Sequence, residues 1–266
     1  MKKRFSIVFL CALLVFSSCA HALSGTEIAV LKIGKADAII ITTAEHTILI
    51  DAGEEEDAEE ILTFLASKRI QTLDAMIITH FDKDHVGGAD GILEGIEVRM
   101  VYDADYESGS KQYGEYLDAL NASGVERMRV SQPLELVYGG LQLSLMPAAL
   151  ETQDDNDNSL VISMADAWHT FLFAGDAEEA RIDELLADGI TPHNLLKMPH
   201  HGRMKDNLAD FLDAVGPDIA IITDSDKNPA DNETLALLSA RGIDTYETRD
   251  GDIRVISSSS GLSVMQ

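Results

Sequence analysis

Short apolar runs alternate with segments of helical spacing along the first half of this chain, and that order predicts an α/β fold. Four apolar runs predict strands, at 28–33, 38–42, 47–50 and 75–79. Residues 58–68 and 113–123 place apolar side chains at helical spacing, and the second segment ends at Gly124. Residues 134–145 alternate around two central glycines, which predicts a β-hairpin.

The second half of the chain repeats this order of strand and helix. Predicted strands lie at 159–164, 170–174, 195–198, 218–223, 245–246 and 253–256. Predicted helices lie at 178–186, 207–215 and 232–240. Two strand-rich halves that carry outer helices are typical of a layered sandwich, in which loops from both halves meet at one edge. Because no Pro-rich or low-complexity linker divides residues 23–266, we expect them to form one domain.

The first 22 residues have the composition of a secretory signal. Three basic residues at 2–4 precede an apolar stretch over 5–14, and Ala-His-Ala at 20–22 resembles a cleavage site. We therefore expect residues 1–22 to be removed and the protein to be secreted or extracytoplasmic, with no membrane span afterwards. Lipidation of Cys19 and an uncleaved anchor are the alternatives. Both cysteines, Cys11 and Cys19, lie in this segment, so the mature chain would hold no disulfide.

The chain is strongly acidic, and this bears on its partners. Its formal net charge is −26, and loss of the three basic residues at 2–4 gives −26 − 3 = −29. A field of this sign repels polyanions, so we expect long nucleic acid to be a poor partner and the substrate to be small or oligomeric. The same charge would also keep an exported protein soluble without any role in recognition. Nothing in the sequence indicates an obligate protein partner.

Residues 79–88 carry the densest group of chemically active side chains in the sequence. Four potential metal ligands lie within six positions: His80, Asp82, Asp84 and His85. They directly follow an apolar run that predicts a buried strand, and a loop at the end of such a strand has a rigid base. Imidazole and carboxylate groups suit zinc, manganese or iron. The alternative is an acidic surface turn that contains two histidines.

The segment at 79–88 is one of five patterns that follow one another in a fixed order along the chain. They are GKADA at 34–38, LIDAG at 49–53, THFDKDHVGG at 79–88, NSLV at 158–161 with AGD at 174–176, and LKMPHHG at 196–202. Together they resemble the motifs of the metallo-β-lactamase superfamily, in particular its ComEC-like subgroup, which contains the C-terminal domain of a competence DNA-uptake protein. The resemblance covers nearly all of residues 23–266. It implies a four-layer αββα sandwich and a hydrolase that uses two divalent metal ions, zinc or manganese.

The resemblance also implies roles for individual residues. The implied metal ligands are His80, Asp82, Asp84, His85, Asp176 and His200, and the implied catalytic residues are Asp84 and His201. Asp176 would bridge the two ions, although on its own it could be a helix N-cap. We expect His200 to be the ligand and His201 to support it or protonate the leaving group, because adjacent residues at a strand exit face opposite sides. Asp51 would orient the ligands or only occupy a turn.

The favoured function is hydrolysis of a phosphodiester by a metal-bound hydroxide. Four basic residues near the motifs would hold a phosphate or only balance the acidic ligands: Lys83, Lys197, Arg203 and Lys205. Asn158 and Ser159 stand where many superfamily members supply another histidine, and such an oxygen-rich site leans toward manganese. The alternatives are a carboxylic ester, lactone or amide hydrolase and a non-catalytic, metal-binding extracellular module. Residues 226–230 lack a histidine seen in DNA-uptake homologues, so DNA uptake itself is not expected.

Two groups of aromatic residues have more ordinary interpretations. Four tyrosines in one segment would pack in the core or, less readily, line a substrate lid: Tyr102, Tyr106, Tyr113 and Tyr116. Three isolated histidines lie in predicted turns and are expected to be solvent-exposed: His46, His169 and His193. Neither group adds to the predicted metal site.

Overall fold

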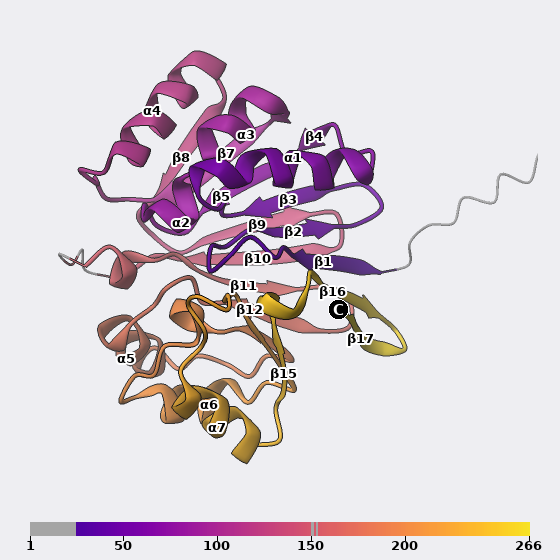
Figure 1. Cartoon of the computed structure of the whole chain (residues 1–266), viewed down its shortest axis with the longest axis vertical. Helices are drawn as coiled ribbons and strands as arrows, with labels where there is room; N and C mark the ends of the chain where they lie inside the picture. Colours follow the sequence, from indigo (N-terminus) through magenta and orange to yellow (C-terminus); the bar gives the residue numbers. More distant parts are fainter. Residues whose placement is uncertain (1–24, 150–151, 153) are drawn as a thin grey trace, which may run out of the picture.

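The computed structural model describes residues 25–149, 152 and 154–266, so the predicted secretory signal lies outside the described residues. Two mixed β-sheets pack face to face, and helices cover the outer face of each sheet (Figure 1). The layers therefore run helix, sheet, sheet, helix, which confirms the predicted four-layer αββα sandwich. Within the described residues, no helix has the length and apolar character needed to cross a bilayer.

The first sheet has eight strands and belongs mainly to the N-terminal half. In spatial order they are β17 (Gly261–Met265), β16 (Ile253–Ser258), β1 (Thr26–Val30), β2 (Ile39–Thr42), β3 (Thr47–Ile50), β5 (Ala75–Ile78), β7 (Met100–Ala104) and β8 (Glu126–Val130). Neighbours from β17 to β3 are antiparallel, whereas β3, β5, β7 and β8 are parallel. Strand β1 pairs with β16, so strands that are far apart in the sequence are neighbours in this sheet.

The second sheet has seven strands and follows the same plan. In spatial order they are β15 (Asp244–Glu247), β14 (Ile219–Ile222), β13 (Leu195–Lys197), β12 (Thr170–Phe173), β11 (Val161–Ala165), β10 (Leu141–Met146) and β9 (Leu134–Tyr138). Strands β9 to β12 are antiparallel neighbours, and β12 to β15 are parallel. Strands β9 and β10 form the predicted hairpin. Each sheet therefore combines an antiparallel part with a parallel part.

Helices cover the outer faces of the two sheets (Figure 1). The first sheet carries α1 (Ala58–Ser67), α3 (Ala89–Gly95) and α4 (Lys111–Ser123), with the short α2 (Lys83–Val86) at its edge. The second sheet carries α5 (Glu179–Ala187), α6 (Leu208–Val215) and α7 (Asn232–Ala240). The smaller elements are β4 (Thr72–Leu73), β6 (Glu97–Val98), η1 (Glu55–Asp57), η2 (Asn156–Asn158), η3 (Pro199–Gly202) and η4 (Thr248–Asp250).

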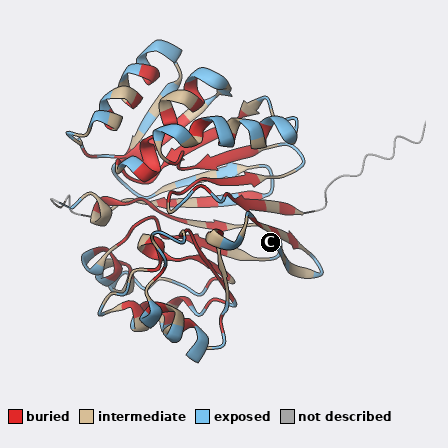
Figure 2. Cartoon of the chain, in the orientation of Figure 1, coloured by how far each residue is buried: buried red, intermediate tan, exposed pale blue. Residues whose placement is uncertain are grey.

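Buried residues concentrate in the strands of both sheets (Figure 2). One apolar cluster includes residues of both sheets, and a second lies among the second sheet and its helices. In β13, Leu195 belongs to the first cluster and Leu196 to the second, because successive side chains of a strand face opposite sides. Helix α6 buries Leu208, Phe211, Leu212 and Val215 at helical spacing. Burying four such side chains contributes roughly 6–12 kcal/mol before entropy is counted.

The structure also contains elements that the hydrophobic pattern did not indicate, namely β7, β8, β17 and α3. Strand β8 reads Glu-Arg-Met-Arg-Val, and it lies at the edge of its sheet, where charged side chains are tolerated. Arg127 on this strand pairs with the buried Asp103 at 2.7 Å. The expectation that His193 is exposed is wrong. Its ring is buried, with one nitrogen 2.8 Å from Ser163 Oγ and the other 2.7 Å from the Thr191 carbonyl oxygen.

Candidate metal centre

The candidate residues follow the carboxyl ends of parallel strands. Asp51 follows β3, and His80 lies two residues beyond β5. In the second sheet, Asp176 lies beyond β12 and His201 beyond β13. Strands β3 and β5 are parallel neighbours, as are β12 and β13. Because side chains at the carboxyl ends of neighbouring parallel strands converge at one sheet edge, the topology gathers residues from both halves in one place.

Asp176 lies at the centre of the resulting cluster. Its Oδ1 is 3.3 Å from His85 Nε2, and its Oδ2 is 3.0 Å from His201 Nε2. His201 Nε2 is also 3.4 Å from Asp84 Oδ2. The rings of His80 and His85 lie 4.0 Å apart between centroids. Two overlapping buried triads could each hold an ion, His80 with His85 and Asp176, and Asp37 with His85 and His201. The overlap is consistent with a dinuclear centre.

The donor atoms of this cluster fit a metal because they are buried and unsatisfied. Within the described residues, the atoms without a hydrogen-bond partner include Nε2 of His80, His85 and His201 and one carboxylate oxygen each of Asp37, Asp84 and Asp176. Several of these atoms contact one another or Lys35 at 2.5–3.4 Å without forming a hydrogen bond, and a buried polar atom without a hydrogen bond costs about 1–3 kcal/mol. A bound cation would satisfy several of them at once. Imidazole nitrogens and carboxylate oxygens are donors that both zinc and manganese accept.

Asp51 holds one of the histidines in place. Its carboxylate accepts hydrogen bonds from the backbone N–H of Thr79 and from the Thr79 hydroxyl, both at 2.7 Å. Its Oδ2 lies 2.8 Å from His85 Nδ1, which leaves only Nε2 of that ring free for a metal. Asp51 also has a positive φ of 57°, so the backbone turn and the orienting role occur in the same residue. Both interpretations of Asp51 therefore apply, and His85 can serve one ion rather than two.

Asp37 and Lys197 form a buried ion pair, and of the two only Lys197 received a role in the sequence-based prediction, to hold a phosphate or to balance the acidic ligands. Both side chains are 1% exposed, and Lys197 Nζ contacts Asp37 Oδ2 directly. The same Nζ lies 3.7 Å from Asp176 Oδ1 and donates a hydrogen bond to the Gly175 carbonyl oxygen at 3.3 Å. Asp37 lies in the GKADA segment, which resembles a family motif. The spacing of residues along the chain does not indicate that Lys197 of β13 contacts it. The pair adds a fixed positive charge beside the acidic cluster.

The structure places the two adjacent histidines in the opposite order from the prediction. His201 is buried in the cluster, whereas His200 is 23% exposed with Nδ1 2.6 Å from Glu178 Oε1. The reason is local, because both residues adopt left-handed backbone conformations, with φ of 43° and 54°. The chain after β13 thus turns sharply instead of continuing as an extended strand. The geometry assigns the ligand role to His201 and leaves His200 at the rim.

The protonation states of the cluster follow from burial and neighbouring charges. Burial lowers the pKa of His80 well below its usual value, and the nearby His85 adds to the effect. Burial also opposes charge on His85, but the carboxylates of Asp176, Asp51 and Asp37 outweigh it and raise the pKa of His85 well above its usual value. Burial likewise opposes ionisation of Asp176, yet His201 and His85 hold the pKa of that carboxyl well below its usual range. The carboxylate is therefore ionised at neutral pH, as a metal ligand must be.

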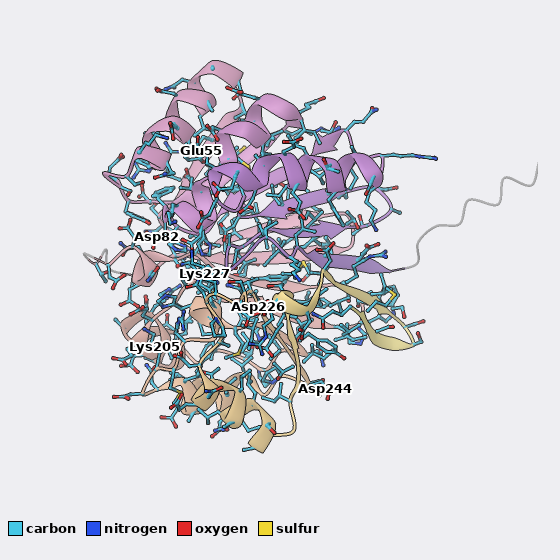
Figure 3. All side chains as sticks on the ribbon, viewed as in Figure 1. Glu55, Asp82, Lys205, Asp226, Lys227 and Asp244 are labelled. Carbon is cyan, nitrogen blue, oxygen red and sulfur yellow. The ribbon has the colours of Figure 1, made fainter. Side chains whose placement is uncertain are left out.

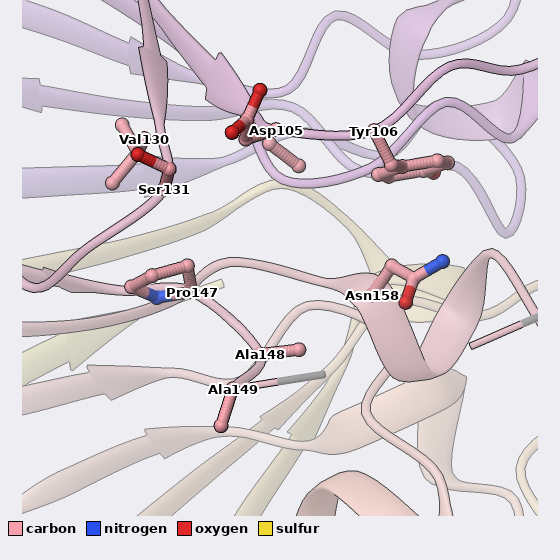
Figure 4. Close-up of a pocket in the computed structure, with 9 residues that line it drawn as sticks. Asp105, Tyr106, Val130, Ser131, Pro147, Ala148, Ala149 and Asn158 are labelled. Atoms are coloured by element: carbon pink, nitrogen blue, oxygen red, sulfur yellow. The ribbon is translucent and has the colours of Figure 1, made fainter. Parts of the chain in front are cut away.

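Asp82 is the most exposed member of the predicted ligand set, and a cavity lies beyond Tyr106 next to it. The Asp82 side chain is 45% exposed, and its Oδ2 is 4.0 Å from His80 Nε2. Between these two residues, the backbone N–H of Phe81 donates a hydrogen bond to Tyr106 Oη at 2.8 Å. Tyr106 and Asn158 line a cavity of about 180 Å³, together with small residues such as Ala148 (Figure 4). The four tyrosines between residues 102 and 116 are all buried, so they pack in the interior and do not form a substrate lid.

The four basic residues expected either to hold a phosphate or to balance the acidic ligands are paired with separate carboxylates. Lys83 pairs with Glu54 at 3.1 Å, Arg203 with Asp231 at 3.0 Å and Lys205 with Glu178 at 2.8 Å, while Lys197 is buried against Asp37. Figure 3 shows Asp82 near the line along which the two halves meet, and Lys205 on the C-terminal half. Lys197 alone lies near a predicted acidic ligand, Asp176 at 3.7 Å, and the other three balance carboxylates outside the ligand set.

Known proteins resemble this chain in sequence. Residues 32–222 match the profile of the Metallo-beta-lactamase superfamily. Recombination protein 2 of Haemophilus influenzae is 29% identical over 233 residues, which is 85% of this chain and 27% of that protein. ComE operon protein 3 of Bacillus subtilis is 30% identical over 173 residues, which is 63% of this chain and 22% of that protein. These matches confirm the ComEC-like resemblance, and the chain spans about a quarter of the length of these relatives.

A solved structure shares the fold. The metallo-beta-lactamase fold protein YhfI from Bacillus subtilis matches with a TM-score of 0.63 at 11% sequence identity, covering 88% of this chain and 100% of that chain. Likeness at this identity concerns the fold alone. The family profile, by contrast, covers more than half of the sequence and includes every residue of the buried cluster. The chain therefore belongs to the metallo-beta-lactamase superfamily.

Proposed function

We propose that this protein is a dinuclear metal-dependent hydrolase that acts on phosphodiesters, with zinc or manganese as its ions. The observation that carries the proposal is the set of buried, unsatisfied donor atoms at the carboxyl ends of β3, β5, β12 and β13. A purely structural cluster of this size would place too many unpartnered polar atoms in the interior.

The donors divide naturally between two ions. Asp84, His85 and His201 would hold one ion, and His80 with Asp82 would hold the other, with Asp176 near both sets. The second set contains a single nitrogen ligand, which favours manganese at least as much as zinc there. Bound divalent ions supply Lewis acidity and lower the pKa of water toward about 7.

The chain's own groups prepare the site for this chemistry. Asp51 fixes the orientation of the His85 ring, so that Nε2 faces the cluster. Lys197 offsets the charge of Asp37 in the interior and keeps the net charge of the buried acidic groups low. Asp82, with 45% of its side chain exposed, is the point at which the predicted ligand set meets solvent. A substrate can therefore enter beside a preorganised and otherwise dry group of ligands.

The choice of a phosphodiester over a carboxylic ester is supported by the relatives and by the site's charge. One relative is named a recombination protein, and recombination concerns nucleic acids, whose linkage is the phosphodiester. A centre of two divalent ions also suits the charge that develops on a transferring phosphoryl group. Since the chain spans only a quarter of that relative, DNA uptake and long nucleic acid are not part of the proposal. The substrate we propose is a small or oligomeric diester.

Hydrolysis of two chromogenic substrates tests the proposal. Metal-free protein should be inactive, and added Zn²⁺ or Mn²⁺ should restore turnover of bis-p-nitrophenyl phosphate more than turnover of p-nitrophenyl acetate. Asp84→Asn should abolish turnover, because Asp84 is a buried donor of the cluster. Restored turnover of the acetate ester alone would favour the carboxylic ester alternative. Two bound ions without turnover of either substrate would favour a non-catalytic binding module.

We also propose that the protein is exported with removal of residues 1–22. The support is the order of basic residues, apolar stretch and small residues at the start of the chain. Mass spectrometry of the protein recovered from outside the cytoplasm should give a chain that begins at residue 23. A full-length mass, or a lipid-modified Cys19, would contradict cleavage after Ala22.

A further inference from the structure

Lys35 lies in the GKADA motif, but the proposed ligand set gives it no role. It lies in the loop between β1 and β2, and its Nζ is 2.5 Å from Asp84 Oδ2. The Lys35 side chain is 32% exposed, whereas Asp84 is 5% exposed. One end of this lysine therefore contacts a buried donor of the cluster, and its flank faces solvent.

The loop that carries Lys35 is fixed to the site by its backbone. The N–H of Asp37 donates to the Asp84 carbonyl oxygen at 3.0 Å, and the N–H of Gly53 donates to the Asp37 carbonyl oxygen at 2.9 Å. These bonds tie the loop to α2 and to the turn after β3. Lys35 is thus held at the mouth of the site by the fold, and its contact with Asp84 is not a chance meeting of two surface side chains.

Lys35 differs from the other cations near the centre. Among the lysines and arginines that the structure describes, only Lys35 and Lys197 form ion pairs with carboxylates of the cluster that comprises Asp37, Asp84 and Asp176. Lys197 is 1% exposed and cannot reach a ligand in solvent. Lys35, on a flexible four-carbon stem, can reach both Asp84 and a molecule at the rim.

Asp84 Oδ2 has two prospective partners, Lys35 Nζ and a divalent cation, that compete for it. It belongs to the unsatisfied donors that fit a metal, yet it is also the atom that Lys35 Nζ contacts. An ammonium and a divalent cation repel each other strongly at a few ångströms outside bulk water. Metal binding at Asp84 should therefore release the Lys35 ammonium toward solvent, where the substrate enters.

We propose that Lys35 is a specificity-determining residue that caps Asp84 in the metal-free protein and binds a non-bridging oxygen of an anionic phosphate in the metal-loaded protein. The second role rests on the proposed phosphodiesterase function, whereas the first depends only on the observed ion pair. An anionic diester gains a charge-assisted contact from this ammonium, and a neutral carboxylic ester does not. Lys35 thus supplies the positive charge that the four other basic residues do not offer to substrate.

Three variants test the two roles by direct binding. Lys35→Gln removes the charge, Lys35→Arg keeps it, and Lys83→Gln is the matched control, because Lys83 is an exposed lysine next to Asp84 that pairs with Glu54. Titration of the metal-free proteins with Zn²⁺ or Mn²⁺ against a chromophoric chelator should show tighter binding for Lys35→Gln, by roughly tenfold. Lys83→Gln should bind metal like the wild type. Equal metal affinity in Lys35→Gln and wild type would overturn the capping role.

Binding of inorganic phosphate to the metal-loaded proteins tests the second role. Calorimetry should show affinity for phosphate roughly tenfold to a hundredfold weaker in Lys35→Gln, with most of it retained in Lys35→Arg and all of it in Lys83→Gln. For bis-p-nitrophenyl phosphate, KM should rise by a similar factor while turnover of p-nitrophenyl acetate stays unchanged. Unchanged phosphate affinity in Lys35→Gln, or an equal loss in Lys83→Gln, would overturn the inference. If the wild type fails to cleave any diester, the proposed function fails, and phosphate binding alone still decides the role of Lys35.

Discussion

Replacement of Asp51 by asparagine should weaken metal binding while the fold is retained. Asp51 is fully buried, and its two oxygens accept hydrogen bonds from the Thr79 backbone N–H, the Thr79 hydroxyl and His85 Nδ1. In Asp51→Asn, the remaining oxygen can still accept from the Thr79 N–H. The new amide group cannot accept a hydrogen bond from His85 Nδ1–H, because it is itself a donor. His85 must then carry its proton on Nε2, the nitrogen that faces Asp176.

The size of the effect follows from the lost contacts. Removal of a partner that orients a metal-binding histidine costs about 10–100-fold in metal affinity. The lost charge-assisted hydrogen bond costs about 1.5–3 kcal/mol of stability in the metal-free protein. For a domain of this size, that corresponds to a decrease in Tm of roughly 3–12 °C. Competition with a chromophoric chelator measures the affinity, and circular dichroism measures the unfolding transition.

Asp74→Asn is the matched control. Asp74 is also buried, and it accepts hydrogen bonds from the Thr47 backbone N–H at 2.9 Å and from Arg99 at 2.6 Å, at the start of β5 rather than at its metal-binding end. This variant should lose a similar amount of stability and keep the wild-type metal affinity. Wild-type affinity in Asp51→Asn, or an equal loss of affinity in Asp74→Asn, would refute the orienting role of Asp51.

Three further predictions concern stability. Burial raises the pKa of Asp57 to about 6, above its unfolded value of 3.8, so the folded state binds this proton more tightly and is stabilised as the pH falls through 6. As the pH falls from about 7.5 to 4.5, the free energy of unfolding of the wild type in urea should therefore rise by about 1 kcal/mol relative to that of Asp57→Asn, a figure reduced because Asp57 is half-exposed. A difference between the two proteins that does not change with pH would contradict this. Gly87→Ala should destabilise the fold by at least about 2 kcal/mol, because the added Cβ would lie 2.2 Å from the Lys83 carbonyl oxygen. Gly114→Ala is the control in α4: its added Cβ meets nothing within 4 Å, so it should stabilise the fold by about 1 kcal/mol. Chelation of bound metal should lower Tm by roughly 10 °C in a thermal scan, and an unchanged Tm would argue against a metal linked to folding.

Much of the fold was predictable because its strands and helices have clear periodicities. The bounds of β3 (Thr47–Ile50) and α7 (Asn232–Ala240) agree with the predicted ranges. Strand β5 was recognisable because it is fully buried and therefore continuously apolar. Strand β8 was missed because a charged edge strand lacks that signal, and its arginines are compensated by Asp103 and Asp105, which no local pattern reveals.

The site was predictable in position but not in detail. Motif order placed His80, Asp84, His85 and Asp176 together, and the structure brings these residues into one cluster. The exchange of roles between His200 and His201 depends on two left-handed backbone conformations, which non-glycine residues adopt rarely and which sequence spacing does not indicate. Lys35 and Lys197 reach the site through contacts across separate strands and loops, so only the folded chain shows which cations face the centre.

A count of bound metal ions tests the central claim most directly. Native mass spectrometry of the wild type and of Asp176→Asn, each saturated with Zn²⁺ or Mn²⁺ and then desalted, gives the number of ions per chain. Because Asp176 contacts His201 and also forms a buried triad with His80 and His85, we predict two ions in the wild type and at most one in the variant. No bound metal in the wild type, or two ions in both proteins, would contradict the account of a dinuclear centre built around Asp176.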